Sequence, residues 1–244
     1  MPRGFNWYRV DDFPAFSVGQ KVDTGGQLEF KDYSSRGAHS RVKFLGASEH
    51  DSFKEYFVEH ETERSIKHRF DKDIREKLIQ IAEFYIFEHK DGYFLVDTNY
   101  KNLRELVARL QATWPEKLLQ FRTRSIDLAG LRNDVERKAG TTEISGGYFR
   151  NLMINRVSAA SIFGPDVGES ELWDEFSAKG QLTGVWLNFE FYGEPTSIMV
   201  TRHGGIVTFQ SFGEKTLLEL LEAINAYIEP FSKETALSAV RRRG

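Results

Sequence analysis

Apolar and polar side chains alternate along residues 185–192. The apolar residues occupy every second position from Val185 to Phe191, while Asn188 and Glu190 fall on the opposite face. A period of two is typical of a strand that is buried on one face and exposed on the other. The sequence therefore predicts a half-buried β-strand here.

The chain then continues into a predicted hairpin and helix. Residues 198–200 and 206–209 have strand-like composition, and Gly204-Gly205 between them supplies the positive φ of a tight turn. Apolar residues next recur at i, i+3, i+4, i+7 and i+11, which predicts one buried face of a helix ending near Pro230. These residues are Leu217, Leu220, Leu221, Ile224 and Ile228.

A second segment repeats this order upstream. Residues 81–87 and 93–96 read as strands joined by a turn at Asp91-Gly92, and a helical pattern with the same spacing follows. The residues of that pattern are Leu103, Leu106, Val107, Leu110 and Trp114, and Pro115 ends it.

These patterns predict an α+β fold, built mainly on antiparallel sheet with helices packed on it, and containing two ββα units (81–115 and 197–230). An internal duplication would explain the recurrence as a pseudo-repeat. The chance recurrence of a common structural unit is the favoured explanation, since outside the turn and the helical pattern the residues do not match.

The remaining segments are predicted individually. Residues 49–80 carry charges of alternating sign, and Ile66, Phe70, Ile74 and Leu78 lie four residues apart, which predicts an exposed helix with a narrow apolar face. A strand is expected over 118–126. Asp127 is expected to cap a short helix that runs to Lys138, and 148–163 is expected to be one extended run.

Towards the C-terminus, Ser170 is predicted to cap a short helix that stops at Gly180. Four parts are expected: an aromatic-rich segment packed on the body (1–48), the charged helix with the first ββα unit (49–145), the second sheet and helix unit (146–230), and a basic tail (231–244). The tail is predicted to be a weak, frayed helix. No Pro- or Ser-rich linker separates two halves.

Composition narrows the class of protein. The 244 residues are 40% hydrophobic and 14% aromatic, which is enough material for a sizeable core. Cysteine is absent, which excludes disulfides, thiolate catalysis and Cys-ligated metal sites. No apolar run approaches the roughly 18 residues of a membrane span. A soluble protein of the cytoplasm, without membrane contact, is expected.

The familiar catalytic motifs are incomplete. His60 and Arg64 occupy the spacing of a zincin helix, but an arginine cannot ligate a metal, so a solvated helix surface is predicted there. The glycine pairs lack phosphate-loop spacing. Glu88–Lys90 and Glu136–Lys138 match only half of a metal-dependent nuclease signature. No catalytic residue, metal ligand or cofactor is predicted.

One basic and aromatic constellation remains. Arg122 and Arg124 alternate on a predicted strand and should share a face. Tyr148, Arg150 and Arg156 are separated by even numbers of residues on the extended run, so they should point to the same face. This places an aromatic ring beside guanidinium groups. Such a surface suits phosphate contacts and base stacking. Alternatively, these arginines pair, inside the fold, with the carboxylates of the acidic segment 157–200.

Two functions follow from these observations. The favoured one is a non-enzymatic binding or assembly module, which engages a protein partner and uses a basic face within 117–156 for nucleic-acid phosphates. The alternative is a metal-dependent nuclease or other phosphodiester enzyme, whose acidic residues are dispersed in the sequence and converge in space. The partner and the oligomeric state are left open.

Overall fold

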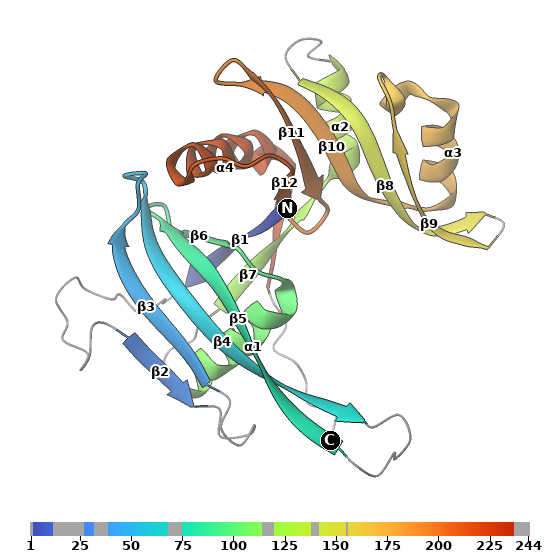
Figure 1. Cartoon of the computed structure of the whole chain (residues 1–244). Helices are drawn as coiled ribbons and strands as arrows, with labels where there is room; N and C mark the ends of the chain where they lie inside the picture. The colour runs from blue at the N-terminus through green and yellow to red at the C-terminus, as the bar shows by residue number, and fades with distance from the viewer. Residues whose placement is uncertain are drawn as a thin grey trace. The chain divides into compact units, whose positions relative to one another are not determined.

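The protein is described here by a computed structural model covering residues 2–11, 27–31, 39–67, 75–113, 120–137, 142–154 and 156–236. In this part of the chain, residues 2–7 and 123–236 form one compact unit (unit 1), and residues 8–122 contribute the other (unit 2). Figure 1 shows a mixed architecture of antiparallel sheet with α-helices. The predicted α+β class is therefore confirmed at this level.

The described residues of unit 2 form an antiparallel meander with one helix. Its strands follow one another in the sheet in the order of the chain. They are β2 (Gln27–Lys31), β3 (His39–Ala47), β4 (Phe53–Lys67), β5 (Arg75–His89) and β6 (Tyr93–Val96), and α1 (Tyr100–Thr113) comes next. The predicted turn at Asp91-Gly92 joins β5 to β6, with Gly92 at a φ of 81°. Leu103, Leu106 and Leu110 of α1 are buried in the core, as predicted.

The predicted helix over 49–80 is wrong. This segment contains β4 and the first six residues of β5, and the two strands pair along their whole length from Phe53↔His89 to Lys67↔Arg75. From residue 56 to residue 62 the buried side chains of β4 recur every second residue, at Tyr56, Val58, His60 and Thr62. Two of these four residues, His60 and Thr62, are polar, so the apolar residues alone do not show the period of two that is typical of a strand. The spacing of four between apolar residues therefore led to the prediction of a helix. Residues 68–74, which include Phe70 and Ile74, lie outside the described residues.

In its described part, unit 1 contains the second sheet region and three α-helices. Its elements, in chain order, are the first part of β1 (Arg3–Asp11), most of β7 (Gln120–Ile126), α2 (Leu128–Arg137), β8 (Thr142–Ile154), β9 (Val157–Phe163), η1 (Val167–Glu169), α3 (Glu171–Lys179), β10 (Gln181–Phe191), β11 (Glu194–Thr201), β12 (Gly205–Thr208), α4 (Glu214–Ile228), η2 (Glu229–Phe231) and β13 (Ser232–Ala236). The strands run β1-β12-β11-β10-β8-β9 across the sheet. Helices α2 and α3 pack against β8 and β10.

Several predictions for unit 1 are confirmed. Strand β10 and the β11–β12 hairpin lie where the alternation and the glycine pair placed them, with Gly204 at a φ of 75°. All five apolar residues predicted to form the buried face of the last helix are buried in α4. The Asp127 carboxylate accepts from Gly130 N at 3.1 Å, and the Ser170 hydroxyl accepts from Trp173 N at 3.2 Å, so both predicted caps are present.

Two predictions for unit 1 are corrected. The extended run 148–163 is a hairpin, because the chain reverses at Arg156 between β8 and β9. Residues 232–236 form strand β13, where a weak helix was predicted. Pairing with β7 explains the strand, since a short segment without a helical pattern takes the conformation that its neighbour stabilises. The three terminal arginines lie outside the described residues.

The boundaries between the units fall within strands β1 and β7. No change in composition marks either position. Both hairpin–helix units exist, as β5–β6–α1 and β11–β12–α4, but their origin in a duplication is not confirmed. Within the described residues, no helix has the length and apolar character needed to cross a membrane.

Candidate functional site

Arg124 is an internal residue of unit 1. Its side chain is buried, with 2% of the residue exposed. The Nη1 atom of Arg124 donates a hydrogen bond to Asn225 Oδ1 of α4. The same atom lies 3.0 Å from Glu229 Oε2. The Arg124 Cβ also leaves little space beside the β11–β12 turn, since a Cβ at Gly204 would come within 3.1 Å of it. Arg124 is therefore engaged inside unit 1, but its carboxylate partner Glu229 lies outside the acidic segment 157–200.

Arg122 and Arg156 have different surroundings from those expected. Arg122 is half-buried and belongs to unit 2, whereas Arg124 belongs to unit 1. Arg156 is exposed at the turn of the β8–β9 hairpin, with a left-handed φ of 68°. Strand parity with Arg150 therefore does not apply to it, because the two residues are not on one strand.

Tyr148 and Arg150 are adjacent on the surface of β8, as their parity predicted. The Arg150 guanidinium carbon lies 5.6 Å from the centre of the Tyr148 ring, and Arg150 Nε donates to the Tyr148 hydroxyl at 3.3 Å. Arg150 is exposed, and neither it nor Arg156 forms an ion pair with a described carboxylate. An exposed guanidinium over a ring is held in place while its charge stays available to a ligand.

The tip of the same hairpin exposes apolar side chains. Met153 is 90% exposed and Val157 is 43% exposed. A register shift lies between Arg150 and Ile154, and Asn151 within it has a φ of 54°. Bulges of this kind bend a strand and re-aim its side chains. Tyr148, Arg150, Met153, Arg156 and Val157 together are called the hairpin surface below.

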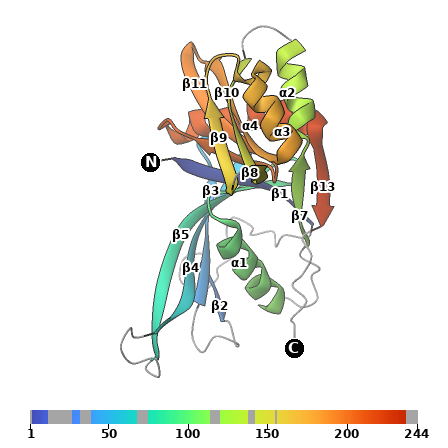
Figure 2. The same ribbon diagram turned by 90° about the vertical axis from the view of Figure 1, so that its right-hand side faces the viewer.

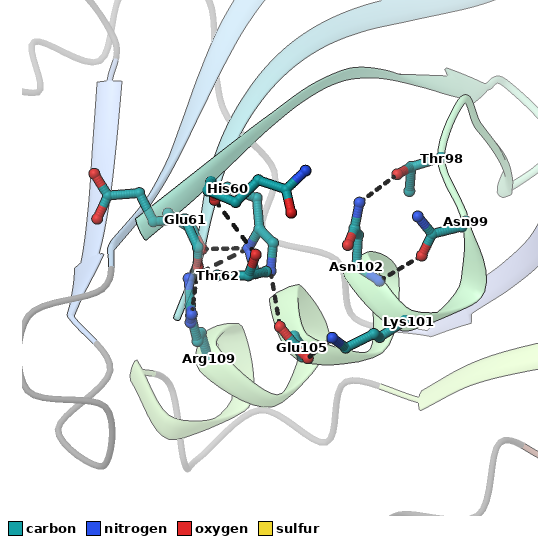
Figure 3. A network of polar contacts seen from close by, with 11 residues as sticks. His60, Glu61, Thr62, Thr98, Asn99, Lys101, Asn102, Glu105 and Arg109 are labelled. Carbon is teal, nitrogen blue, oxygen red and sulfur yellow. Dashed lines mark hydrogen bonds and ion pairs between the residues drawn. The ribbon is translucent and has the colours of Figure 1, made fainter. Parts of the chain in front are cut away.

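Unit 2 contains a buried polar network that the sequence did not predict (Figure 3). His60 of β4 and Ser40 of β3 are fully buried, and Ser40 Oγ lies 2.8 Å from His60 Nδ1. From α1, Arg109 Nη1 donates to Ser40 Oγ at 2.7 Å and Arg109 Nη2 donates to the Glu61 carbonyl oxygen at 2.7 Å. Glu105 Oε2 lies 3.5 Å from His60 Nε2.

The contacts define the tautomer of His60. Arg109 can only donate, and its Nη1 lies 3.3 Å from His60 Nδ1. Two donors cannot face each other, so Nδ1 is the acceptor and the ring proton is on Nε2, towards Glu105. The Ser40 hydroxyl accepts from Arg109 and donates to Nδ1.

The chain of contacts from the Ser40 hydroxyl through the His60 imidazole to the Glu105 carboxylate resembles a catalytic triad. Ser40 and His60, however, are each 0% exposed, so a substrate has no access to the hydroxyl. The network instead joins α1 to β3 and β4, because its hydrogen bonds form only when these three elements are correctly positioned. The predicted solvated helix surface around His60 is therefore wrong. No local signal marked His60, because its partners come from residues far away in the sequence.

Burial also changes the acid–base behaviour of a nearby tyrosine in unit 2. Burial, and then the hydrogen bond that its hydroxyl donates to Glu88 Oε2 at 2.5 Å, raise the pKa of Tyr56 well above the ordinary tyrosine value. Tyr56 is part of the core and its Glu88 partner is on β5. This hydroxyl therefore stays protonated and holds β4 to β5.

Carboxylates line one cavity of unit 1. Glu136, Glu143, Asp166 and Glu169 surround a volume of about 300 Å³. Glu136 Oε1 is already bound by Arg132 Nε at 2.6 Å. Among the described residues, no group of three or more His, Cys, Asp or Glu side chains has a geometry suited to a metal ion.

No protein family model matches this chain, and no curated protein sequence matches it either.

Proposed function

We propose that this protein is a binding and assembly module without a catalytic centre of its own, and that it contacts a protein partner at the hairpin surface. The observation that carries the proposal is the pair of half-buried Tyr148 and exposed Arg150 on the strand that also carries the 90% exposed Met153. Tyr, Met and Arg are the residue types enriched at the centres of protein interfaces.

The charge of the surface indicates the chemistry of the partner. Arg150 and Arg156 carry two positive charges with no described carboxylate in contact, so an acidic segment complements them. A bidentate carboxylate on Arg150 would leave the Tyr148 ring and Met153 for apolar contacts. An acidic protein segment therefore fits both components of the surface.

Nucleic acid fits less well. Arg124 is engaged inside unit 1, which removes it from the basic face, and Arg122 belongs to the other unit. Two remaining arginines would neutralise about two phosphates, which gives a salt slope of only about 1.8 on duplex DNA. The Tyr148 ring could still stack on a base. Nucleic-acid binding is therefore kept as the second outcome of the same experiment.

Fluorescence anisotropy separates these outcomes. The probes are a labelled glutamate-rich peptide and a labelled single-stranded DNA oligonucleotide, titrated at low and high salt. The proteins are the natural chain, Arg150→Ala and the control Arg137→Ala, which removes an equal charge from the exposed end of α2.

Peptide binding that weakens at least about fivefold in Arg150→Ala, the effect of roughly 1 kcal/mol at an interface hot spot, and not in Arg137→Ala supports the proposal. Binding of DNA alone would replace the protein partner by nucleic acid. Equal effects of the two substitutions, or no binding of either probe, would contradict the assignment of this surface.

The alternative, a metal-dependent phosphodiester enzyme, would use the carboxylate-lined cavity, although no group of three or more of its described side chains has a metal-binding geometry. Such an enzyme needs carboxylates that share a divalent ion. Thermal unfolding with and without Mg²⁺ or Mn²⁺ tests it, because a cation that binds the native state raises the melting temperature. A rise that disappears in Glu143→Gln and Glu169→Gln would favour the enzyme. An unchanged melting temperature would count against it.

A further inference from the structure

Strand β9 is an open edge of the sheet in unit 1. The strand order ends at β9, and among the described residues no strand pairs with its outer side. In Figure 2, β9 is the strand nearest the viewer, and α2 and α3 lie to one side of it. Along Val157–Phe163 five of the seven residues are exposed and two are half-buried. The sequence VSAASIF contains none of the lysines, prolines or charges that usually protect an edge.

The register shows which backbone groups of β9 point outwards. Gly164 N donates to Ser145 O at 3.2 Å, and the next pair is Phe163↔Gly146. Hydrogen-bonded and non-hydrogen-bonded pairs alternate in an antiparallel ladder. The amide and carbonyl of Ala160 therefore point towards β8, and those of Ala159, Ser161 and Phe163 point away from it. The outer edge offers donors and acceptors at every second residue.

These outward groups are self-complementary. When two copies of β9 lie antiparallel with a two-fold axis at Ala160, Ala159 of each copy faces Ser161 of the other, and both pairs have the required orientation. Ala160 then faces its own copy in a non-hydrogen-bonded pair, where the strands come closest. A small side chain suits that position.

The side chains and charges match in the same register. Val157 and Phe163, which are 43% and 62% exposed, would face each other across the seam at both ends. Aromatic and β-branched residues are a favourable cross-strand pair. Arg156 precedes β9, and exposed Asp166 follows it, so the basic end of one strand meets the acidic end of the other.

We infer that β9 is a dimerisation edge, at which a second copy of this chain adds its own β9 to form a continuous antiparallel sheet. This inference goes beyond the proposed function and does not depend on it. Tyr148, Arg150 and Met153 are on β8 and lie outside the seam, whereas Arg156 and Val157 of the hairpin surface would take part in it.

The absence of cysteine allows a direct test. In a non-hydrogen-bonded antiparallel pair the Cα atoms are about 4.5 Å apart, within the range that a disulfide spans. Mild oxidation of Ala160→Cys should give a covalent dimer on a non-reducing gel. The control Ser158→Cys should stay monomeric, because its thiol would face Ile162 of the other copy. Equal cross-linking of the two variants, or none of Ala160→Cys, would overturn the inference.

A second pair of variants tests the same edge without a covalent bond. Light scattering should show a concentration-dependent rise from 28.1 kDa to twice that mass for the natural chain. Ser161→Pro removes an outward amide and should abolish the rise, while Ser161→Ala keeps the amide and should preserve it. A natural chain that stays at the monomer mass at every concentration, with no Ala160→Cys dimer, would contradict dimerisation, whatever the result with acidic probes.

Discussion

Arg124 and Arg150 are arginines on strands of unit 1 with opposite environments. Arg124 is buried and contacts Asn225 and Glu229, whereas Arg150 is exposed and stacks on Tyr148. Strand parity correctly predicted the Tyr148–Arg150 neighbourhood. It could not predict the burial of Arg124, because the residues that cover Arg124 lie about a hundred positions further along the chain.

Arg124→Ala should lower the stability of the protein by about 1–3 kcal/mol, because it leaves Asn225 and Glu229 without their donor. Arg150→Ala should change stability by no more than about 0.5 kcal/mol, since its side chain is on the surface. Urea unfolding of the two variants checks this contrast. A similar cost for both would mean that the two environments are not different.

Because of Tyr56, the free energy of unfolding should depend on pH in the alkaline range. Burial first, and the bond to Glu88 second, raise its pKa in the folded protein. Its contribution is therefore complete below the ordinary tyrosine pKa of about 10 and is lost as pH rises above it, because the unfolded chain ionises there first.

The melting temperature of the natural protein minus that of Tyr56→Phe should accordingly decrease as the pH is raised from about 9 to about 11. The Phe variant is the reference because it cancels the titration of lysines and of other tyrosines. A difference that stays constant over this range would exclude the contribution of Tyr56.

The helices and the long β4–β5 hairpin show what a pattern of residues can predict. The apolar positions of α1 and α4 follow the helical period closely, and the described ones pack in the cores of their units. Strand β4 buries His60 and Thr62 in the places where a strand pattern would need apolar residues. Their partners, Arg109 and the Gln80 carbonyl, make that burial favourable, and neither is visible locally.

The core helices predict large costs for truncation. Leu106→Ala in α1 and Leu220→Ala in α4 should each destabilise the protein by about 2–5 kcal/mol, because each leaves a cavity at a fully buried position. Leu172→Ala on α3 is the matched control, since that leucine is 53% exposed, and should cost about 0.5 kcal/mol or less. Denaturant unfolding gives the comparison. Equal costs at all three sites would refute the assigned packing.

At the scale of the whole molecule, the chain passes between its two units within strands, so composition carries no trace of the boundaries at 7 and 122. The candidate surface shows the same limit. A pattern could place Tyr148 beside Arg150, yet the turn at Arg156 and the free edge of β9 depend on which strands pair. Pairing partners distant in the sequence are selected by the fold as a whole.

Amide hydrogen exchange of β9, followed residue by residue in a concentration series, tests most directly that the β8–β9 hairpin is the contact region. The alternation of the ladder predicts that Ala160 and Ile162 are protected even in dilute solution, because their amides bond to β8. Ala159, Ser161 and Phe163 should exchange quickly in dilute solution and become protected as the concentration rises. Fast exchange of these three amides at every concentration, or their full protection in dilute solution, would contradict the account.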